Sequence, residues 1–164
     1  MAQLSTLGHV HAFMKTITAY VLTCLSVVAA GTNDVQVVTT TDTNAQTGVL
    51  ISIQTFTRGG QTNLLRETRT RADAFVDRKQ TFYHDGLRLG GFVTYPHGST
   101  FFSAAGASCF LTVNYDAYSS IQSAWIMSSN MVMVDAFTCT NGILYPEDSA
   151  YIQRIASRSH GLPH

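Results

Sequence analysis

The chain has 164 residues, and its 10 basic residues balance its 10 acidic residues at neutral pH. A chain with no net charge has no overall field that would draw it to nucleic acid or to an acidic lipid surface, so neither partner is expected. Its hydrophobic content of 45% is enough for one folded core.

The first 30 residues have the order of a secretory signal. Lys15 precedes an apolar run, Thr16 to Ala30, which ends in small residues. A positive charge, an apolar segment and a small-residue exit are together typical of an export signal. The residues before Met14 contain no Lys or Arg, so translation from Met14 would give a more ordinary signal than translation from Met1. We expect residues 1–30 to be removed and the mature protein to be secreted or otherwise extracytoplasmic.

Three other interpretations of this run stay open. A membrane-spanning helix needs about 20 apolar residues, and this run is shorter and includes several threonines. A buried core helix is disfavoured by the many β-branched residues, which lose rotamer freedom in helices. A lipid anchor at Cys24 would follow Thr23, which is larger than the residue normally found there.

The expected pairing of the cysteines depends on whether this segment is removed. Removing it would take Cys24 away and leave Cys109 and Cys139 in an oxidising compartment. The pair predicts a disulfide, which would stabilise the fold by about 3–4 kcal/mol in the chain-entropy model. The alternative is two buried thiols, which behave as small hydrophobic groups.

The rest of the chain, residues 31–158, has the pattern of a single β-rich domain. Val49, Ile51 and Ile53 alternate with polar residues, as in a strand with one buried face. Asp85-Gly86 and Asn141-Gly142 are typical of tight hairpin turns. About eight short strands at regular spacing predict a mainly β fold, an antiparallel β-sandwich or barrel. The expected strands span residues 35–41, 49–57, 63–71, 75–83, 87–95, 100–103, 109–115, 123–127 and 131–139.

One short helix is expected at the C-terminal end. Capping oxygens and early negative charge occur between Pro146 and Ser149. Tyr151, Ile152 and Ile155 then recur at helical spacing. An isolated helix of this length is marginal in water, so its apolar face should pack on a sheet. Residues 159–164 are expected to form a flexible tail.

Most of the basic residues outside the signal lie between positions 58 and 88. Arg69 and Arg71 are two residues apart in an expected strand, so they point the same way, as does Glu67. They are candidates for an anion site that would take a glycan, a lipid head group or a phosphate. The alternative is a solvated sheet face, on which Asp73 and Asp77 intersperse negative charge and discourage edge aggregation.

Methionines mark the apolar second half of the chain. Met127, Met131 and Met133 would share one strand face. Thioethers line adaptable ligand pockets, but they also fill irregular cores. If the sheet closed into a barrel, this face would be the candidate lining of an apolar cavity. The aromatic residues that could join it are Trp125, Phe110 and Tyr115.

Candidate catalytic groups are sparse. His84 and His97 are the histidines outside the leader and tail, with Asp85 and Asp116 among their possible carboxylate partners. With His84 at a hairpin tip and His97 about 10 residues further on, the two imidazoles would lie about 30 Å apart. Neither a metal site nor a cofactor is therefore expected. The Gly-x-Ser-x-Gly motif of many serine hydrolases is absent from the sequence.

The sequence therefore favours a secreted, non-catalytic module that binds a small apolar or anionic ligand, or a protein surface. The first alternative is a small extracytoplasmic hydrolase that uses His84 or His97. The second is a structural or host-directed secreted protein. No stable membrane span is expected in the mature chain.

Overall fold

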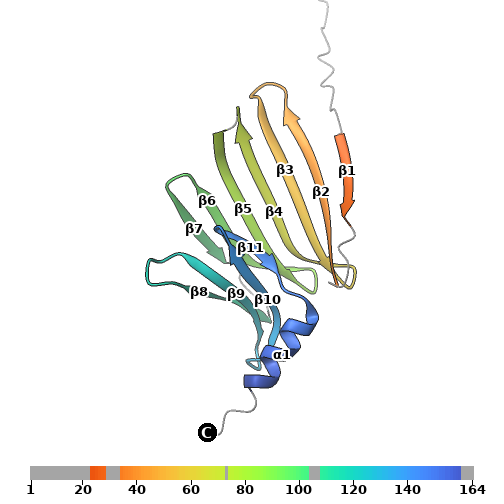
Figure 1. Cartoon of the computed structure of the whole chain (residues 1–164), viewed down its shortest axis with the longest axis vertical. Helices are drawn as coiled ribbons and strands as arrows, with labels where there is room; N and C mark the ends of the chain where they lie inside the picture. Colours follow the sequence, from red (N-terminus) through yellow and green to blue (C-terminus); the bar gives the residue numbers. More distant parts are fainter. Residues whose placement is uncertain (1–22, 29–33, 73, 104–107, 160–164) are drawn as a thin grey trace, which may run out of the picture.

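The computed structural model describes residues 23–28, 34–72, 74–103 and 108–159, which form two antiparallel sheets and one helix (Figure 1). Every strand within a sheet pairs with its neighbours in the sequence. Sheet A contains β1 (Thr23–Val28), β2 (Val35–Asn44), β3 (Val49–Arg58), β4 (Gln61–Arg71), β5 (Ala74–His84), β6 (Leu87–Tyr95) and β7 (Gly98–Ser103). Sheet B contains β8 (Cys109–Tyr115), β9 (Ile121–Ser128), β10 (Met133–Thr140) and β11 (Ile143–Pro146).

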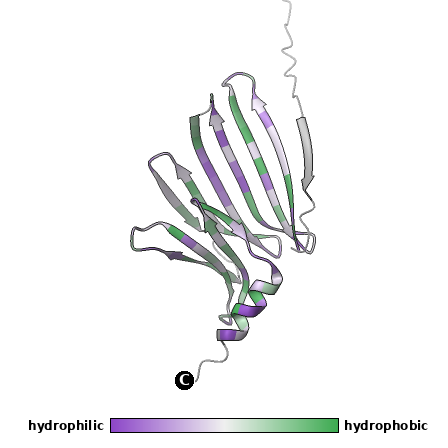
Figure 2. Ribbon diagram, in the orientation of Figure 1, coloured by the Kyte–Doolittle hydropathy of each residue, from purple (hydrophilic) through white to green (hydrophobic). Residues whose placement is uncertain are grey.

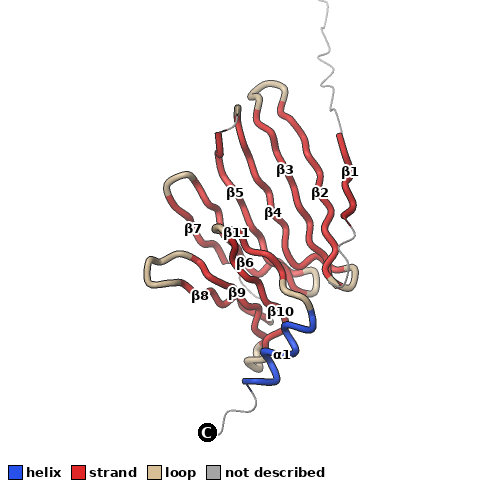
Figure 3. Tube along the Cα trace, in the orientation of Figure 1, coloured by secondary structure: helices blue, strands red, loops and turns tan. Residues whose placement is uncertain are grey.

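The predicted mainly β architecture with a short C-terminal helix is confirmed (Figure 3). Within the described residues neither sheet closes on itself, since β1 and β7 are the edges of sheet A and β8 and β11 the edges of sheet B. A closed barrel is therefore not seen in that part of the chain.

Two-residue turns set the strand register. Asp85 and Gly86 have φ of 48° and 73°, and Asn141 and Gly142 have φ of 52° and 73°. Positive φ at both turn residues matches the right-handed twist of the flanking strands. Both predicted hairpins are therefore confirmed, and each turn holds its two strands in a fixed pairing.

The expected signal segment overlaps β1 at the edge of sheet A (Figure 1). Val28 of β1 pairs with Val37 of β2, and Thr23 pairs with Thr41. The other residues of this segment lie outside the described part of the chain, so the signal stays a prediction. Its removal would take β1 with it and leave β2 as the edge strand.

Two strand predictions near the end of the chain need correction. The strand expected from residue 131 begins at Met133, because Met131 has a φ of 59° and donates its N–H to the Ser128 carbonyl at 3.0 Å in a turn. The four-residue strand β11 was not expected after the Asn141-Gly142 turn. It is too short for a periodic pattern to reveal.

Aromatic side chains from both sheets form the core. Phe82 of β5 has an exposed fraction of 0% and lies with its ring centroid 4.7 Å from that of Phe137 of β10. Phe92 of β6 packs edge-on against Phe82 at 6.1 Å. Figure 2 shows hydrophobic and hydrophilic bands mixed along the strands of sheet A. The face of that sheet that supplies the core carries Phe56, Leu64, Phe82 and Phe92, and we call it the inner face.

The predicted Cys109–Cys139 disulfide is absent, and both thiols are free. Cys109 of β8 pairs with Ser128 at one end of β9, whereas Thr138, next to Cys139, pairs with Ser123 near the other end. At about 3.3 Å per residue the two cysteines lie well beyond the distance of about 7 Å that a bridge between Cα atoms allows. Burial raises the pKa of the Cys139 thiol.

The predicted helix is confirmed as α1 (Ser149–Ser159). Asp148 caps its first turn, because its Oδ1 accepts a hydrogen bond from the Tyr151 N–H at 2.6 Å. Ile152 is buried, and the helix packs against β10 of sheet B. In the described residues no helix combines the length and the apolar character needed to cross a bilayer. The expected tail beyond Ser159 lies outside the described residues.

Candidate functional site

A hollow of about 410 Å³ lies where the β6–β7 hairpin of sheet A faces sheet B, and we call it the inter-sheet hollow. Phe92 and Phe101 of sheet A form one apolar wall, with their ring centroids 5.3 Å apart. Tyr115 and Ile121 supply apolar surface from β8 and β9. Because each sheet contributes one side, the hollow exists only when the two sheets are docked.

Hydroxyl groups line the polar part of the same hollow. Thr94 and Ser99 come from β6 and β7, and the Ser99 hydroxyl donates a hydrogen bond to the Thr94 hydroxyl at 3.1 Å. Ser119 and Ser120 lie opposite, in the turn between β8 and β9. None of the described lining residues carries a charge. An apolar enclosure with a few hydroxyls is typical of sites for small, mainly apolar ligands.

Asp116, a sequence candidate for catalysis, shapes the turn beside this hollow. Its Oδ1 accepts hydrogen bonds from the N–H groups of Tyr118 and Ser120, both at 2.8 Å. Its own N–H donates to the Ser120 carbonyl at 2.9 Å. A carboxylate that satisfies nearby backbone donors is the usual device of a tight turn. Asp116 therefore positions Ser120 at the rim of the inter-sheet hollow.

His84 and Asp85 lie at the other end of β6, beside two adjoining hollows of about 260 and 470 Å³. We call these the turn-side hollows, and Tyr83 and Gln61 line both of them. The His84 Nε2 lies 3.5 Å from Asp85 Oδ2. That carboxylate has an exposed fraction of 77%, so the pair lies in water and interacts weakly.

The two candidate histidines do not share a site. His84 ends β5 and pairs with Leu87 at the start of β6, whereas His97 lies in the turn that joins Tyr95 to Gly98. The length of β6 therefore separates them. Within the described residues no cluster of three or more histidine, cysteine or acidic side chains could hold a metal ion.

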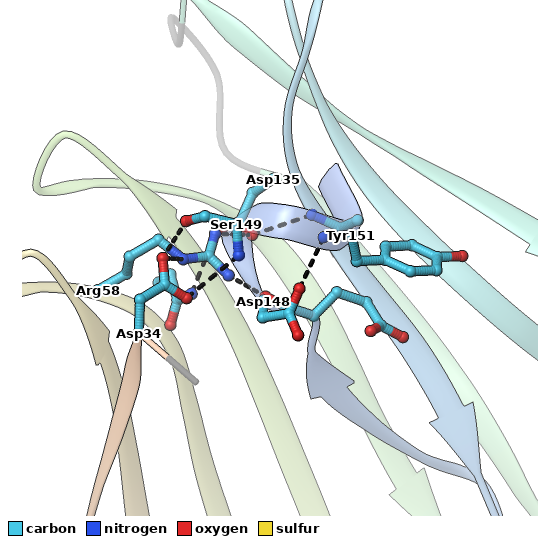
Figure 4. A network of polar contacts seen from close by, with 9 residues as sticks. Asp34, Arg58, Asp135, Asp148, Ser149 and Tyr151 are labelled. Carbon is cyan, nitrogen blue, oxygen red and sulfur yellow. Dashed lines mark hydrogen bonds and ion pairs between the residues drawn. The ribbon is translucent and has the colours of Figure 1, made fainter. Parts of the chain in front are cut away.

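An ion-pair network, the polar junction, joins the two sheets next to the turn-side hollows (Figure 4). The Arg58 guanidinium lies 2.7 Å from Asp135 Oδ1 and 3.3 Å from Asp34 Oδ2. It also donates a hydrogen bond to the Glu147 carbonyl. Arg58 ends β3, Asp135 belongs to β10, and Ser149 at the start of α1 donates to Asp34. One guanidinium thus connects sheet A, sheet B and the segment that leads into the helix.

The Asp135 carboxylate is fully engaged in this junction. Besides Arg58, it accepts hydrogen bonds from Asn63 Nδ2 at 3.2 Å and from the Ala136 N–H at 2.9 Å. Burial raises the pKa of Asp135, and the Arg58 charge, which acts in the opposite direction, only partly offsets this effect. For Asp34, burial also acts to raise the pKa, but hydrogen bonds from Ser149 and the Arg58 charge outweigh it, and the pKa is lowered. With its oxygens occupied by three donors, Asp135 is suited to holding the fold together rather than to moving protons.

The methionine candidates lie away from the core. Met127 of β9 pairs with Met133 of β10 and with Phe110 of β8, and all three alternate with core residues such as Ile126. They therefore lie on the outer face of sheet B, as does Trp125, which pairs with Ala136. Met131 is in a turn with an exposed fraction of 67%. None of these methionines, nor Trp125, lines any of the three hollows.

Arg69 and Arg71 lie on the outer face of sheet A. Arg69 lies 2.5 Å from Glu67 Oε1 and 3.7 Å from Asp77 Oδ2. Carboxylates on both sides therefore compensate its charge. At Arg69 this geometry fits the solvated face better than the anion site that the sequence suggested, and the anion site at Arg71 stays a prediction.

The sequence analysis overlooked Arg66, which lies on the inner face with an exposed fraction of 3%. It donates to Gln54 Oε1 at 2.8 Å, to Gln80 Oε1 at 3.4 Å and to the Leu144 carbonyl. Its guanidinium lies between two aromatic rings, 4.8 Å from that of Phe56 and 4.5 Å from that of Tyr145. Burial lowers the pKa of Arg66 to about 10. Arg66 alternates with Leu64 in the sequence, but Leu65 is equally apolar, so alternation alone could not show that Arg66 lies on the core face.

Comparison of the chain with protein-family models, with curated proteins and with solved structures gave no match.

Proposed function

We propose that this chain is an exported, non-catalytic module that binds a small, mainly apolar ligand between its two sheets, which act as an open sandwich. The observation that carries this proposal is the inter-sheet hollow. Its walls come from both sheets and its polar groups are hydroxyls. A volume of about 410 Å³ lies in the range of about 300–1,000 Å³ that is usual for small-molecule sites.

The composition of the hollow suggests how a ligand would be held. Burying an apolar body against Phe92 and Phe101 supplies affinity in proportion to the area removed from water. The hydroxyls of Thr94 and Ser99 can each donate and accept, so they would orient a polar group on the ligand. Such a site favours a ligand with an apolar body and a polar end.

Binding is better supported than hydrolysis by the surroundings of the candidate catalytic groups. Ser99 lines the hollow, but its hydroxyl donates to Thr94 rather than to an imidazole. His84 lies at the opposite end of β6 from Ser99. His97 is not among the described residues that line the hollow. An activated serine needs a base within hydrogen-bond reach, which the geometry does not supply.

Replacement of Phe101 by alanine should weaken ligand binding in the inter-sheet hollow. The neutral fluorescent probe N-phenyl-1-naphthylamine should bind the native protein, and Phe101→Ala should bind it roughly fivefold to tenfold more weakly because an apolar wall is lost. The matched control is Phe110→Ala. Phe110 has an exposed fraction of 43%, close to the 46% of Phe101, but lies on the outer face of sheet B. Equal binding by the two variants, or no probe binding by the native protein, would contradict the proposal.

Export is the other part of the proposal, and it rests on the charge and hydropathy order of residues 14–30. N-terminal sequencing of protein recovered outside the cytoplasm of an expressing bacterial cell should begin at Gly31. A mature protein that retains residues 23–28 would instead keep β1 as the edge of sheet A. That result would show that residues 23–28 are a strand of the folded protein and not part of a cleaved signal.

A further inference from the structure

One cross-strand row on the inner face of sheet A places a single arginine among hydroxyl groups. Arg78 of β5 pairs with Thr68 of β4 on one side and with Thr94 of β6 on the other. The row continues to Ser52 of β3 and to Ser99 of β7. Residues paired directly across antiparallel strands point to the same face, so these side chains are neighbours.

The row faces the same side of the sheet as the core. Arg78 alternates along β5 with Gln80 and Phe82, which are both buried. The strand has no irregularity between these three positions. The next row toward the core contains Gln54, Arg66 and Gln80. Arg78 therefore lies one row beyond Arg66, on the inner face.

The positive charge of these two arginines is not compensated. Among the described residues no carboxylate lies within ion-pair distance of Arg66 or Arg78. The hydrogen bonds of Arg66 go to neutral oxygens of side-chain amides and of the backbone, and the Arg78 charge acts on it unfavourably. The Nε of Arg78 is buried and has no hydrogen-bond partner in the part of the chain that the structure describes, and the guanidinium lies 5.3 Å from the Phe75 ring centroid. Arg66 is buried and Arg78 is half-buried, and cations in such positions are normally paired in proteins, so this surface would favour an anion.

This row is continuous with the inter-sheet hollow. Thr94 and Ser99 belong to the row and also line the hollow. Phe92 and Phe101, the apolar wall of the hollow, form a pair in the adjacent row. A ligand whose apolar body lies against these rings would therefore have its end close to the hydroxyls next to Arg78.

We propose that Arg78, with the hydroxyls of Thr68 and Thr94, binds the oxyanion end group of an amphiphilic ligand whose apolar body fills the inter-sheet hollow. The inference rests on the function proposed above, and it names the chemical class of the ligand. Arginine suits this role because its planar fork donates two parallel hydrogen bonds to a carboxylate or a phosphate. The hydroxyls on either side can donate to the remaining oxygens.

The test compares decanoate, decyl phosphate and decanol, which share an apolar chain and differ in the end group. Competition with the neutral fluorescent probe at neutral pH gives the three affinities. We expect the native protein to bind at least one of the two anions roughly tenfold to hundredfold more tightly than decanol, as hydrogen bonds to charged groups provide. The preference for decanoate or for decyl phosphate then identifies the end group. Added salt should reduce the difference.

The variants are Arg78→Met, Arg78→Lys and the control Arg88→Met. Arg78→Met should lose the preference for anions while its decanol affinity stays unchanged, which also shows that the hollow is intact. Arg78→Lys should retain part of the preference because the charge remains. Arg88 is exposed and lies on the other side of sheet A, next to the Phe102 ring, so its replacement should change none of the affinities.

The outcomes separate the two proposals. If decanol and the anions bind equally to the native protein, or if Arg78→Met keeps the preference, the anion site is wrong and the ligand-binding hollow stands. If none of the three compounds binds, the proposed function and the anion site both fail.

Discussion

Replacing Asp135 by alanine is expected to lower the free energy of unfolding by about 3 kcal/mol, because it leaves a partly buried guanidinium without its closest carboxylate. The side chains of Arg58 and Asp135 have exposed fractions of 18% and 6%, so water cannot take over the lost contact fully. Arg58 would still contact Asp34 and the Glu147 carbonyl, which places the effect at the lower end of the usual range. Urea unfolding followed by circular dichroism measures the change.

The control for this prediction is Asp85→Asn, since asparagine removes the charge but tolerates the φ of 48° at this turn position, which would strain alanine. Asp85 is also an aspartate paired with a basic side chain, but its carboxylate is 77% exposed. Its replacement should change the free energy of unfolding by no more than about 0.5 kcal/mol. Similar losses in the two variants would show that the polar junction does not hold the sheets together in the way described.

Replacing Phe82 by alanine is expected to cost about 3–5 kcal/mol of the free energy of unfolding, since it removes a large ring from a closely packed site. Phe82 has an exposed fraction of 0% and contacts the rings of Phe92 and Phe137, one from each sheet. The loss should therefore weaken the docking of the two sheets as well as the core. The midpoint of thermal unfolding and the urea unfolding curve report it.

Phe110→Ala serves as the control, because Phe110 has an exposed fraction of 43% on the outer face of sheet B. Its loss should be no more than about 1 kcal/mol. If Phe82→Ala does not fold, Phe82→Leu keeps most of the volume and should cost about 1–2 kcal/mol. A cost for Phe82→Leu no greater than that of Phe110→Ala would contradict the packing described here.

The strands and turns were largely predictable because their causes are local. Alternation along β3 correctly placed Val49, Ile51 and Ile53 on one face, but their partners on β4 are residues 67, 69 and 71, so this face is the outer face of sheet A and not the buried one that alternation suggested. The turns at Asp85 and Asn141 adopt positive φ for reasons that two adjacent residues decide. This reasoning missed β1, which lies within the expected signal segment, β11, which is short, and the start of β10.

The candidate site was less predictable because it depends on which face of sheet A is covered by sheet B. Periodicity gives two faces but does not say which one is the core when both carry apolar residues. Arg69 and Arg66 are three residues apart and lie on opposite faces of β4, yet the sequence drew attention only to the first. The disulfide prediction failed for a related reason, since the positions of Cys109 and Cys139 along sheet B follow from strand pairing rather than from their number.

The pairing of every strand with its sequence neighbours also has a consequence for folding. Hairpins close short loops, so each sheet can assemble quickly and by itself. The contacts between the sheets, such as Arg58 with Asp135 and Phe82 with Phe137, join residues far apart in the sequence and pay a larger entropy of closure. We therefore expect sheet docking to be the late step of folding. A ligand between the sheets would bind only after they dock. It would therefore slow the separation of the two sheets more than it would speed their docking.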